Sequence, residues 1–179
     1  MKNSSLMTKK ETRMKIKMGC KPAYVWASWF GTGFFPFASG TVGSLFTLPL
    51  VYFCLYVGGL SFLLASIVII FFTGRFASKI ILKENPSLSD PSFIVIDEVL
   101  GQLVTFIPLA TFFHSDLPKM NYSIFILGFI LFRFFDITKI WPASFFDKQE
   151  RSAFGIMMDD MIAGLYAAIV LTAYVYFIS

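Results

Sequence analysis

The sequence predicts an all-α fold, a compact multi-helix membrane bundle of about five apolar helices. Composition and charge placement both predict it. Hydrophobic residues make up 56% of the 179 residues and charged residues only 15%, where soluble domains average about 25% charged residues. The charges are also unevenly placed, because residues 22–74 contain none. This composition argues against a disordered chain and against a nucleic-acid-binding domain.

Five apolar segments without charged residues are the candidate helices. They are residues 42–57, 60–73, 99–115, 120–132 and 161–179. The first two are joined at Gly58-Gly59, and prolines inside the segments, Pro49 and Pro108, are tolerated in membrane helices with a kink. Most segments are shorter than the ~20 residues of a spanning helix. Length alone therefore leaves two interpretations, a membrane bundle and a very apolar soluble helical domain.

The distribution of Lys and Arg favours the membrane bundle. With the N-terminus in the cytoplasm and five spans, 14 of the 15 Lys and Arg residues lie on the cytoplasmic side, and only Lys119 lies outside. Seven of them stand in residues 1–21, where Glu11 is the only acidic residue. We therefore expect a flexible basic arm at 1–21 and a single helical domain at 22–179.

A Gly-rich loop precedes the first apolar segment, with the sequence FGTGFFPFASGTVGS at residues 30–44. Its glycines allow main-chain N–H groups to converge on an anion. Thr41 and Ser44 stand where a helix begins, a position that favours phosphate. We expect Gly40, Thr41 and Ser44 to bind such an anion, and a loop that only caps the helix is the alternative.

Two pairs of adjacent carboxylates enter long apolar segments, Asp97-Glu98 and Asp159-Asp160. Acidic residues stabilise the N-termini of helices, which would explain one such pair. Two pairs drawn toward a hydrocarbon core that penalises ionised groups need a further reason. A shared divalent cation is one, and hard oxygen ligands suit Mg²⁺. We expect all four carboxylates to bind metal and to take part in catalysis.

A third polar group consists of Arg133, Asp136 and Lys139, which a helix would place on one stripe. The stripe is either a ladder of salt bridges at the membrane surface or an anion site. In the anion site Arg133 and Lys139 bind phosphate, and Asp136 orients them or acts as a further metal ligand.

All of these motifs fall at the cytoplasmic face in the predicted topology. Carboxylates for a metal, basic groups for an anion and a Gly-rich loop at a membrane surface favour metal-assisted hydrolysis of a phosphoester on a lipid headgroup. A small ion or proton transporter that uses the carboxylates is an alternative of another class. Against it, the acidic pairs lie at the ends of the segments and not in the middle of the bilayer.

At these residues the chain resembles the phosphatidylglycerophosphatase A family, from about Phe30 to Ile178. The resemblance rests on GTGFFPFASGTVGS, DPSFIVIDEVLGQ, FRFFDITKIWP and GIMMDDMIAGLYA. It implies Mg²⁺-dependent hydrolysis of phosphatidylglycerophosphate to phosphatidylglycerol and phosphate, at the cytoplasmic face of the bacterial inner membrane. A relative that acts on another phosphoester is an alternative. Ser39 and Ile140 stand where the family usually has proline, which loosens the backbone near the site.

Overall fold

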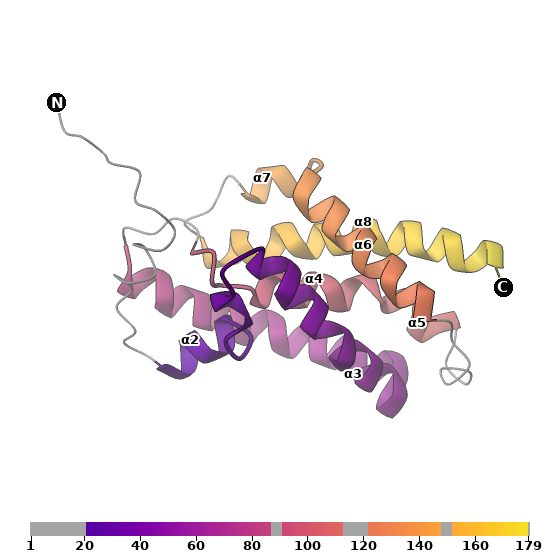
Figure 1. The fold of residues 1–179 in the computed structure, drawn as a ribbon, viewed down its shortest axis with the longest axis horizontal. Helices are drawn as coiled ribbons and strands as arrows, with labels where there is room; N and C mark the ends of the chain where they lie inside the picture. Colours follow the sequence, from indigo (N-terminus) through magenta and orange to yellow (C-terminus); the bar gives the residue numbers. More distant parts are fainter. Residues whose placement is uncertain (1–20, 87–90, 113–121, 148–151, 179) are drawn as a thin grey trace.

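A computed structural model describes residues 21–86, 91–112, 122–147 and 152–178. Within these ranges every regular element is a helix and no strand occurs, which confirms the all-α prediction (Figure 1). The basic arm predicted at 1–21 lies, except for Lys21, outside the described residues. The elements are α2 (Lys21–Ala27), η1 (Thr32–Phe34), α3 (Ser39–Glu84), α4 (Ile96–Thr105), α5 (Ile107–Phe112), α6 (Tyr122–Thr138), α7 (Ala143–Asp147) and α8 (Ala153–Ile178).

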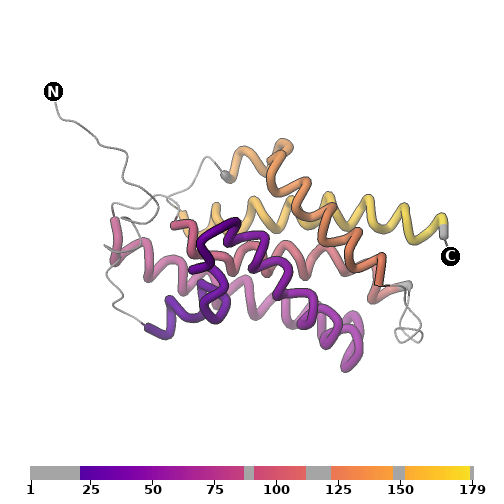
Figure 2. The backbone as a smooth tube through the Cα atoms, viewed as in Figure 1, coloured from indigo at the N-terminus to yellow at the C-terminus, as the bar shows by residue number. Residues whose placement is uncertain are grey.

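Helix α3 folds back on itself at Gly59. This residue has φ 56° and ψ −138°, a backbone conformation that only glycine adopts readily. Sγ of Cys54 lies 3.4 Å from Oγ of Ser66, although twelve residues of straight helix would span about 18 Å. The first arm, before Gly59, therefore lies against the second arm, after it, and the tube in Figure 2 turns back at this point. The turn matches the junction expected at Gly58-Gly59.

Two helices are long and apolar enough to cross a membrane, α3 and α8. The expectation of about five membrane helices is therefore corrected to two candidate spans. The first two expected segments are joined in α3, and the third is divided at Phe106 into α4, with 10 residues, and α5, with 6. Pro108 explains this break, because it has no N–H group and its ring would clash with the carbonyl of Val104. Helix α6 has only 17 residues. The two long apolar helices indicate a membrane-associated protein.

Helix α4 packs between α3 and α8 and forms the centre of the core. Val99, Leu100 and Leu103 on α4 are fully buried. Glycines allow α4 and α8 to approach closely, because a Cβ atom on Gly164 would lie 2.3 Å from the backbone oxygen of Gly101. Small residues at such crossings are typical of helices packed in membranes.

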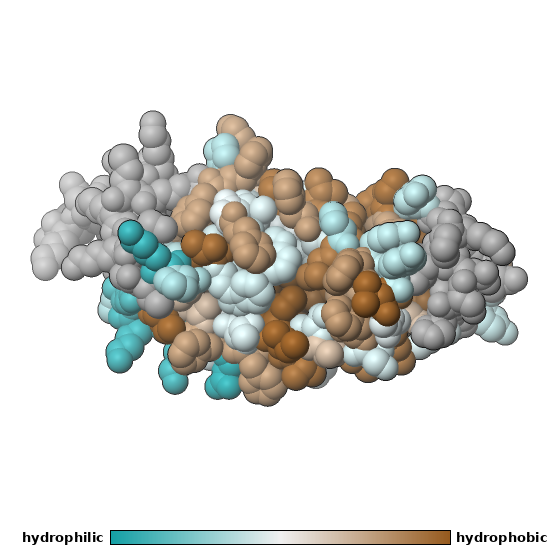
Figure 3. Space-filling model, turned by 90° about the horizontal axis from the view of Figure 1, so that it is seen from below, coloured by the Kyte–Doolittle hydropathy of each residue, from teal (hydrophilic) through white to brown (hydrophobic). Residues whose placement is uncertain are grey.

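The outer surface of α3 and α8 is strongly apolar. Exposed large side chains include Phe46, Phe53, Tyr56, Ile69, Phe72, Phe76, Ile169 and Phe177. In the face shown in Figure 3, the most hydrophilic residues gather toward one end of the molecule, and hydrophobic residues are frequent over the rest. Exposed apolar patches of this size are typical of a surface that meets lipid or another protein.

We expect that the change Gly164→Val destabilises the protein, because the added side chain meets the backbone of α4. Overpacking of this kind costs about 1–3 kcal/mol, which lowers Tm by about 2–10 °C for a chain of this length. Thermal unfolding of the purified protein in detergent measures it. The matched control is Ala173→Val, on an exposed position of the same helix. Equal Tm values for the two variants would contradict the close helix contact.

Candidate metal and phosphate site

A polar cavity of about 180 Å³ lies where the beginnings of α3, α4 and α8 meet the end of α6 and the short helix α7. Five carboxylates and one lysine face it, which is an unusual concentration of charge for so apolar a chain. The lining residues are Ser39, Ser92, Ile94, Asp97, Glu98, Asp136, Lys139, Phe146, Ile156, Asp159 and Asp160. The structure thus brings together side chains from all four motifs that the sequence analysis selected.

Three of the carboxylates form a tight cluster. One oxygen from each of Asp97, Glu98 and Asp160 can be chosen so that all three lie within 4.8 Å of one another. Asp97 and Glu98 stand in the first turn of α4, and Asp160 comes from α8 with only 4% of its surface exposed. Oxygen ligands from carboxylates are those that Mg²⁺, Ca²⁺ and Mn²⁺ prefer. The cluster therefore has the composition of a site for a hard divalent cation.

The helix dipole does not account for both acidic pairs. Helix α8 begins at Ala153, so Asp159 and Asp160 lie nearly two turns inside it, and the dipole effect fades within the first turn. Burial raises the pKa of Asp97 well above its usual value, and the negative charge of Glu98 raises it further. Oε2 of Glu98 is buried and has no hydrogen-bond partner within the described residues. A bound cation would stabilise the ionised form of Asp97 and would give Oε2 of Glu98 a partner.

The two basic side chains of the third motif are held by carboxylates. Nζ of Lys139 lies 3.0 Å from Oδ2 of Asp159, and Nη1 of Arg133 lies 2.6 Å from Oδ2 of Asp136. Asp159 thus faces a lysine, unlike its neighbour Asp160. The expected helical stripe is interrupted, because α6 ends at Thr138 and Lys139 adopts a left-handed φ of 45°. Lys139 reaches the cavity from a turn and not from the helix.

The Gly-rich loop leaves room for neighbouring side chains and contributes few groups of its own to the cavity. A Cβ atom on Gly40 would lie 2.1 Å from Oε1 of Glu98 and 3.3 Å from Nη1 of Arg133, so these two side chains occupy the room that glycine leaves. The hydroxyl of Ser44 donates to the backbone oxygen of Gly40 over 2.8 Å and is fully buried. Neither Thr41 nor Ser44 lines the cavity.

The sequence analysis did not select Ser39 and Ser92 as site residues. Ser39 was noted only as a replacement for a family proline, yet it lines the cavity and its hydroxyl donates to the backbone oxygen of Ser92 over 2.6 Å. This hydrogen bond joins the start of α3 to the segment before α4. The one feature of the sequence that could have indicated Ser39 is its position directly before Gly40. No feature of the sequence indicates that Ser39 pairs with Ser92, 53 residues away.

The fold and the cavity define a membrane-associated helical protein with a candidate metal site. Residues 25–175 match the family model described as Phosphatidylglycerophosphatase A, and the chain belongs to this family. Its members are named as phosphatidylglycerophosphatases, which are phosphoric monoester hydrolases, so the predictions of the family and of an enzyme are confirmed.

Three named relatives match most of the chain. A Phosphatidylglycerophosphatase A of Haemophilus influenzae is 34% identical over 170 residues, 95% of this chain and 98% of that protein. The protein of the same name in Escherichia coli is 31% identical, over 87% of this chain and 84% of its own length. A Bacteroides thetaiotaomicron protein named "Putative phosphatidylinositol-3-phosphatase" is 36% identical, over 79% of this chain and 86% of its own length. No solved structure gives a significant match.

We expect the acidic cluster to bind a divalent cation, and Mn²⁺ is the probe because electron paramagnetic resonance reports its binding directly. Asp97→Asn removes one charge and one ligand while keeping the side-chain shape, so Mn²⁺ affinity should fall about tenfold or more. The matched control is Glu84→Gln, which removes a carboxylate that does not line the cavity. Equal affinities of the wild type and Asp97→Asn would contradict the site.

Proposed function

We propose that the protein hydrolyses the terminal phosphate of phosphatidylglycerophosphate and releases phosphatidylglycerol and inorganic phosphate. The match to the family over residues 25–175 is the observation that carries this proposal. The cavity supports it, because a cluster of carboxylates with adjacent basic groups is what metal-assisted phosphoryl chemistry requires. Two relatives that bear the name of this activity match the chain over 87% or more of its length.

The cation of the site would be Mg²⁺, held by Asp97, Glu98 and Asp160. When bound, it supplies charge to polarise the phosphate and to lower the pKa of a water molecule. Asp159 is not part of the cluster of three carboxylates, and its Oδ2 lies 3.0 Å from Nζ of Lys139. We therefore assign to Asp159 the role of positioning Lys139. This assignment separates the four carboxylates of the two motifs into three ligands and one positioning residue.

The other polar residues would recognise the phosphate. Lys139 lines the cavity and offers a point charge, and Arg133 offers a planar fork that suits phosphate. Arg133 is not among the residues that line the cavity, but its Nε is buried without a hydrogen-bond partner among the described residues, so one donor of the fork is unsatisfied. In the reaction, water oxygen forms a bond to phosphorus as the ester P–O bond breaks. A carboxylate of the cavity takes the proton from water, and a proton returns to the leaving alcohol.

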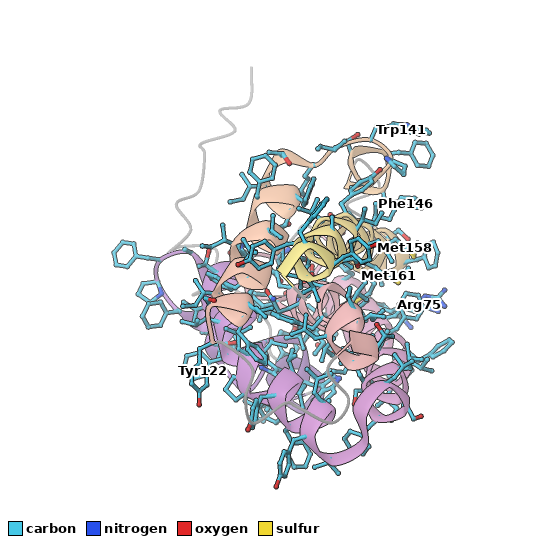
Figure 4. All side chains as sticks on the ribbon, turned by 90° about the vertical axis from the view of Figure 1, so that its right-hand side faces the viewer. Arg75, Tyr122, Trp141, Phe146, Met158 and Met161 are labelled. Carbon is cyan, nitrogen blue, oxygen red and sulfur yellow. The ribbon has the colours of Figure 1, made fainter. Side chains whose placement is uncertain are left out.

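The membrane placement is part of the proposal. We place α8 and both arms of α3 in the bacterial cytoplasmic (inner) membrane as a multi-pass protein, with residues 22–179 as one unit. The distribution of Lys and Arg supports a cytoplasmic location for the N-terminus and the cavity. Exposed aromatic residues flank the cavity, Phe37 at 78% and Trp141 at 75% exposure, two residues from Ser39 and from Lys139. Figure 4 has Trp141 at the outer edge of the molecule, where an aromatic ring would meet the membrane interface.

A second candidate is hydrolysis of a phosphate monoester on another phospholipid headgroup. It is favoured by the Bacteroides thetaiotaomicron relative, which is named as a phosphatidylinositol-3-phosphatase and is 36% identical over 147 residues. The transporter alternative has less support, because the five carboxylates face one cavity at one end of the helices. An ion pathway would need polar groups along the length of the bundle.

Phosphate release from lipid vesicles tests the substrate and the cation together. With Mg²⁺ we expect release from phosphatidylglycerophosphate, and with a chelator we expect none. Asp97→Asn should lower kcat about a hundredfold or more, because a lost ligand removes the metal's contribution to the transition state. Faster phosphate release from phosphatidylinositol 3-phosphate than from phosphatidylglycerophosphate would support the second candidate function. A folded protein that releases phosphate from neither lipid would contradict both.

Arg133→Lys distinguishes phosphate binding from a structural ion pair. The change keeps the charge and loses the fork, so kcat/KM should fall about tenfold, or ~1.4 kcal/mol. Thermal stability should remain close to that of the wild type. The matched control is Arg75→Lys, an exposed arginine outside the cavity that stacks on Phe154. Lost stability with unchanged kinetics would identify Arg133 as part of a salt-bridge ladder only.

A further inference from the structure

A second cavity, of about 380 Å³, lies between α2 and the second arm of α3. None of its lining residues lines the acidic cavity. Its walls are almost entirely apolar, with Pro22 and Trp26 on α2 facing Phe72, Phe76 and Ile80 on α3. We call this cavity the α2–α3 groove. Phe72 and Phe76 in its wall are exposed on α3, a helix long and apolar enough to cross a membrane, so acyl chains are surroundings that it suits.

Two hydrogen bonds fix how α2 runs along α3. Nδ2 of Asn85 donates to Oη of Tyr24 over 2.6 Å, and Nε1 of Trp26 donates to Oγ1 of Thr73 over 3.0 Å. Residue numbers rise along α2 as they fall along α3, so the two helices are antiparallel. The first residue of α2, Lys21, therefore lies at the same end of the α2–α3 groove as the C-terminal end of α3 (Figure 1).

That end of the α2–α3 groove is basic. Lys21 directly precedes Pro22, and Lys83 follows Ile80 by three residues and Phe76 by seven, which places it on the same helical stripe. Both lysine side chains are exposed. An apolar channel with positive charge at one end complements a lipid with apolar chains and an anionic headgroup.

We propose that the α2–α3 groove binds one anionic phospholipid apart from the hydrolytic site. An acyl chain lies against Trp26, Phe72 and Phe76, and the lipid phosphate lies between Lys21 and Lys83. Basic pockets beside membrane helices on the cytoplasmic side bind the headgroups of anionic lipids in this way. The apolar wall accepts the acyl chains of any phospholipid. The two lysines therefore provide the preference for anionic over neutral headgroups.

Quenching of Trp26 fluorescence by brominated acyl chains tests the proposal. The full chain with Trp29→Phe and Trp141→Phe keeps Trp26 as its only tryptophan. It is placed in phosphatidylcholine vesicles that contain brominated phosphatidylglycerol or, separately, brominated phosphatidylcholine at equal mole fraction. We expect the apparent association constant at Trp26 to be about threefold or more higher for the anionic lipid.

Variants at Lys21 and Lys83 test whether these two lysines cause the preference of the α2–α3 groove for anionic lipid. Lys21→Gln with Lys83→Gln should bring the ratio of the two association constants close to one. The matched control, Arg75→Gln, removes a positive charge from the same helix but off the groove, and it should leave the ratio unchanged. A wild-type ratio of one, or a ratio that the lysine changes do not alter, would overturn the proposal.

Native mass spectrometry provides a measurement that needs no tryptophan changes. Wild-type protein released from detergent should retain one phosphatidylglycerol more often than the Lys21→Gln, Lys83→Gln variant does, and Arg75→Gln should behave as the wild type. Equal retention by all three would also overturn the proposal. The result is separable from the proposed hydrolysis. The lysine variant should still release phosphate, whereas Asp97→Asn should lose activity and keep the lipid preference at Trp26.

Discussion

Carboxylates that are brought together inside an apolar protein repel one another, and this repulsion constrains the whole acidic cavity. Asp97, Glu98 and Asp160 hold oxygens within 4.8 Å, where burial further disfavours the ionised form. Arg133 offsets this only in part, because burial still leaves the pKa of Glu98 raised although the charge of Arg133 lowers it. Within the described residues the ion pairs of Lys139 and Arg133 are with Asp159 and Asp136. The division is informative, since two carboxylates already have a cation partner and three do not. A divalent cation is the partner that those three would share.

Backbone proximity holds the three carboxylates in place, and three glycines make it possible. Gly164 on α8 lies against Gly101 on α4, so the helices that carry Asp160 and Glu98 cross with almost no side chain between them. Gly40 on α3 leaves the room that the carboxylate of Glu98 occupies. Bulkier residues at these positions would separate the elements by the width of a methyl group or more. Oxygens that now lie within 4.8 Å would then be too far apart to share an ion, so the glycines set the spacing of the proposed ligands.

Those parts of the structure that depend on a local sequence pattern could be predicted from the sequence. The turn at Gly59 follows from Gly58-Gly59 between two apolar runs, and both acidic pairs were selected because charges are rare in this chain. Features that depend on tertiary contacts were not accessible. Nothing local distinguishes Asp159, which faces Lys139, from Asp160, which faces the cluster. The end of α6 before Lys139 has no local signal either. Two other differences are local in origin, since the Ser44 hydroxyl donates to Gly40 four residues back in α3 and Pro108 divides α4 from α5.

As proposed, the acidic cavity and the α2–α3 groove would recognise an anionic lipid at a membrane surface in opposite ways. A groove that only retains a lipid can be apolar with lysines at one end, because attraction between fixed charges and a headgroup is sufficient. A cavity that cleaves a phosphate must also generate a nucleophile, and lysines alone do not activate water as a bound metal does. Its five carboxylates outnumber Lys139 and Arg133, so a cation bound there would favour an anionic substrate. Under the proposed function, substrate binding and catalytic competence would be coupled in the acidic cavity through the same ion, whereas the α2–α3 groove would bind lipid without it.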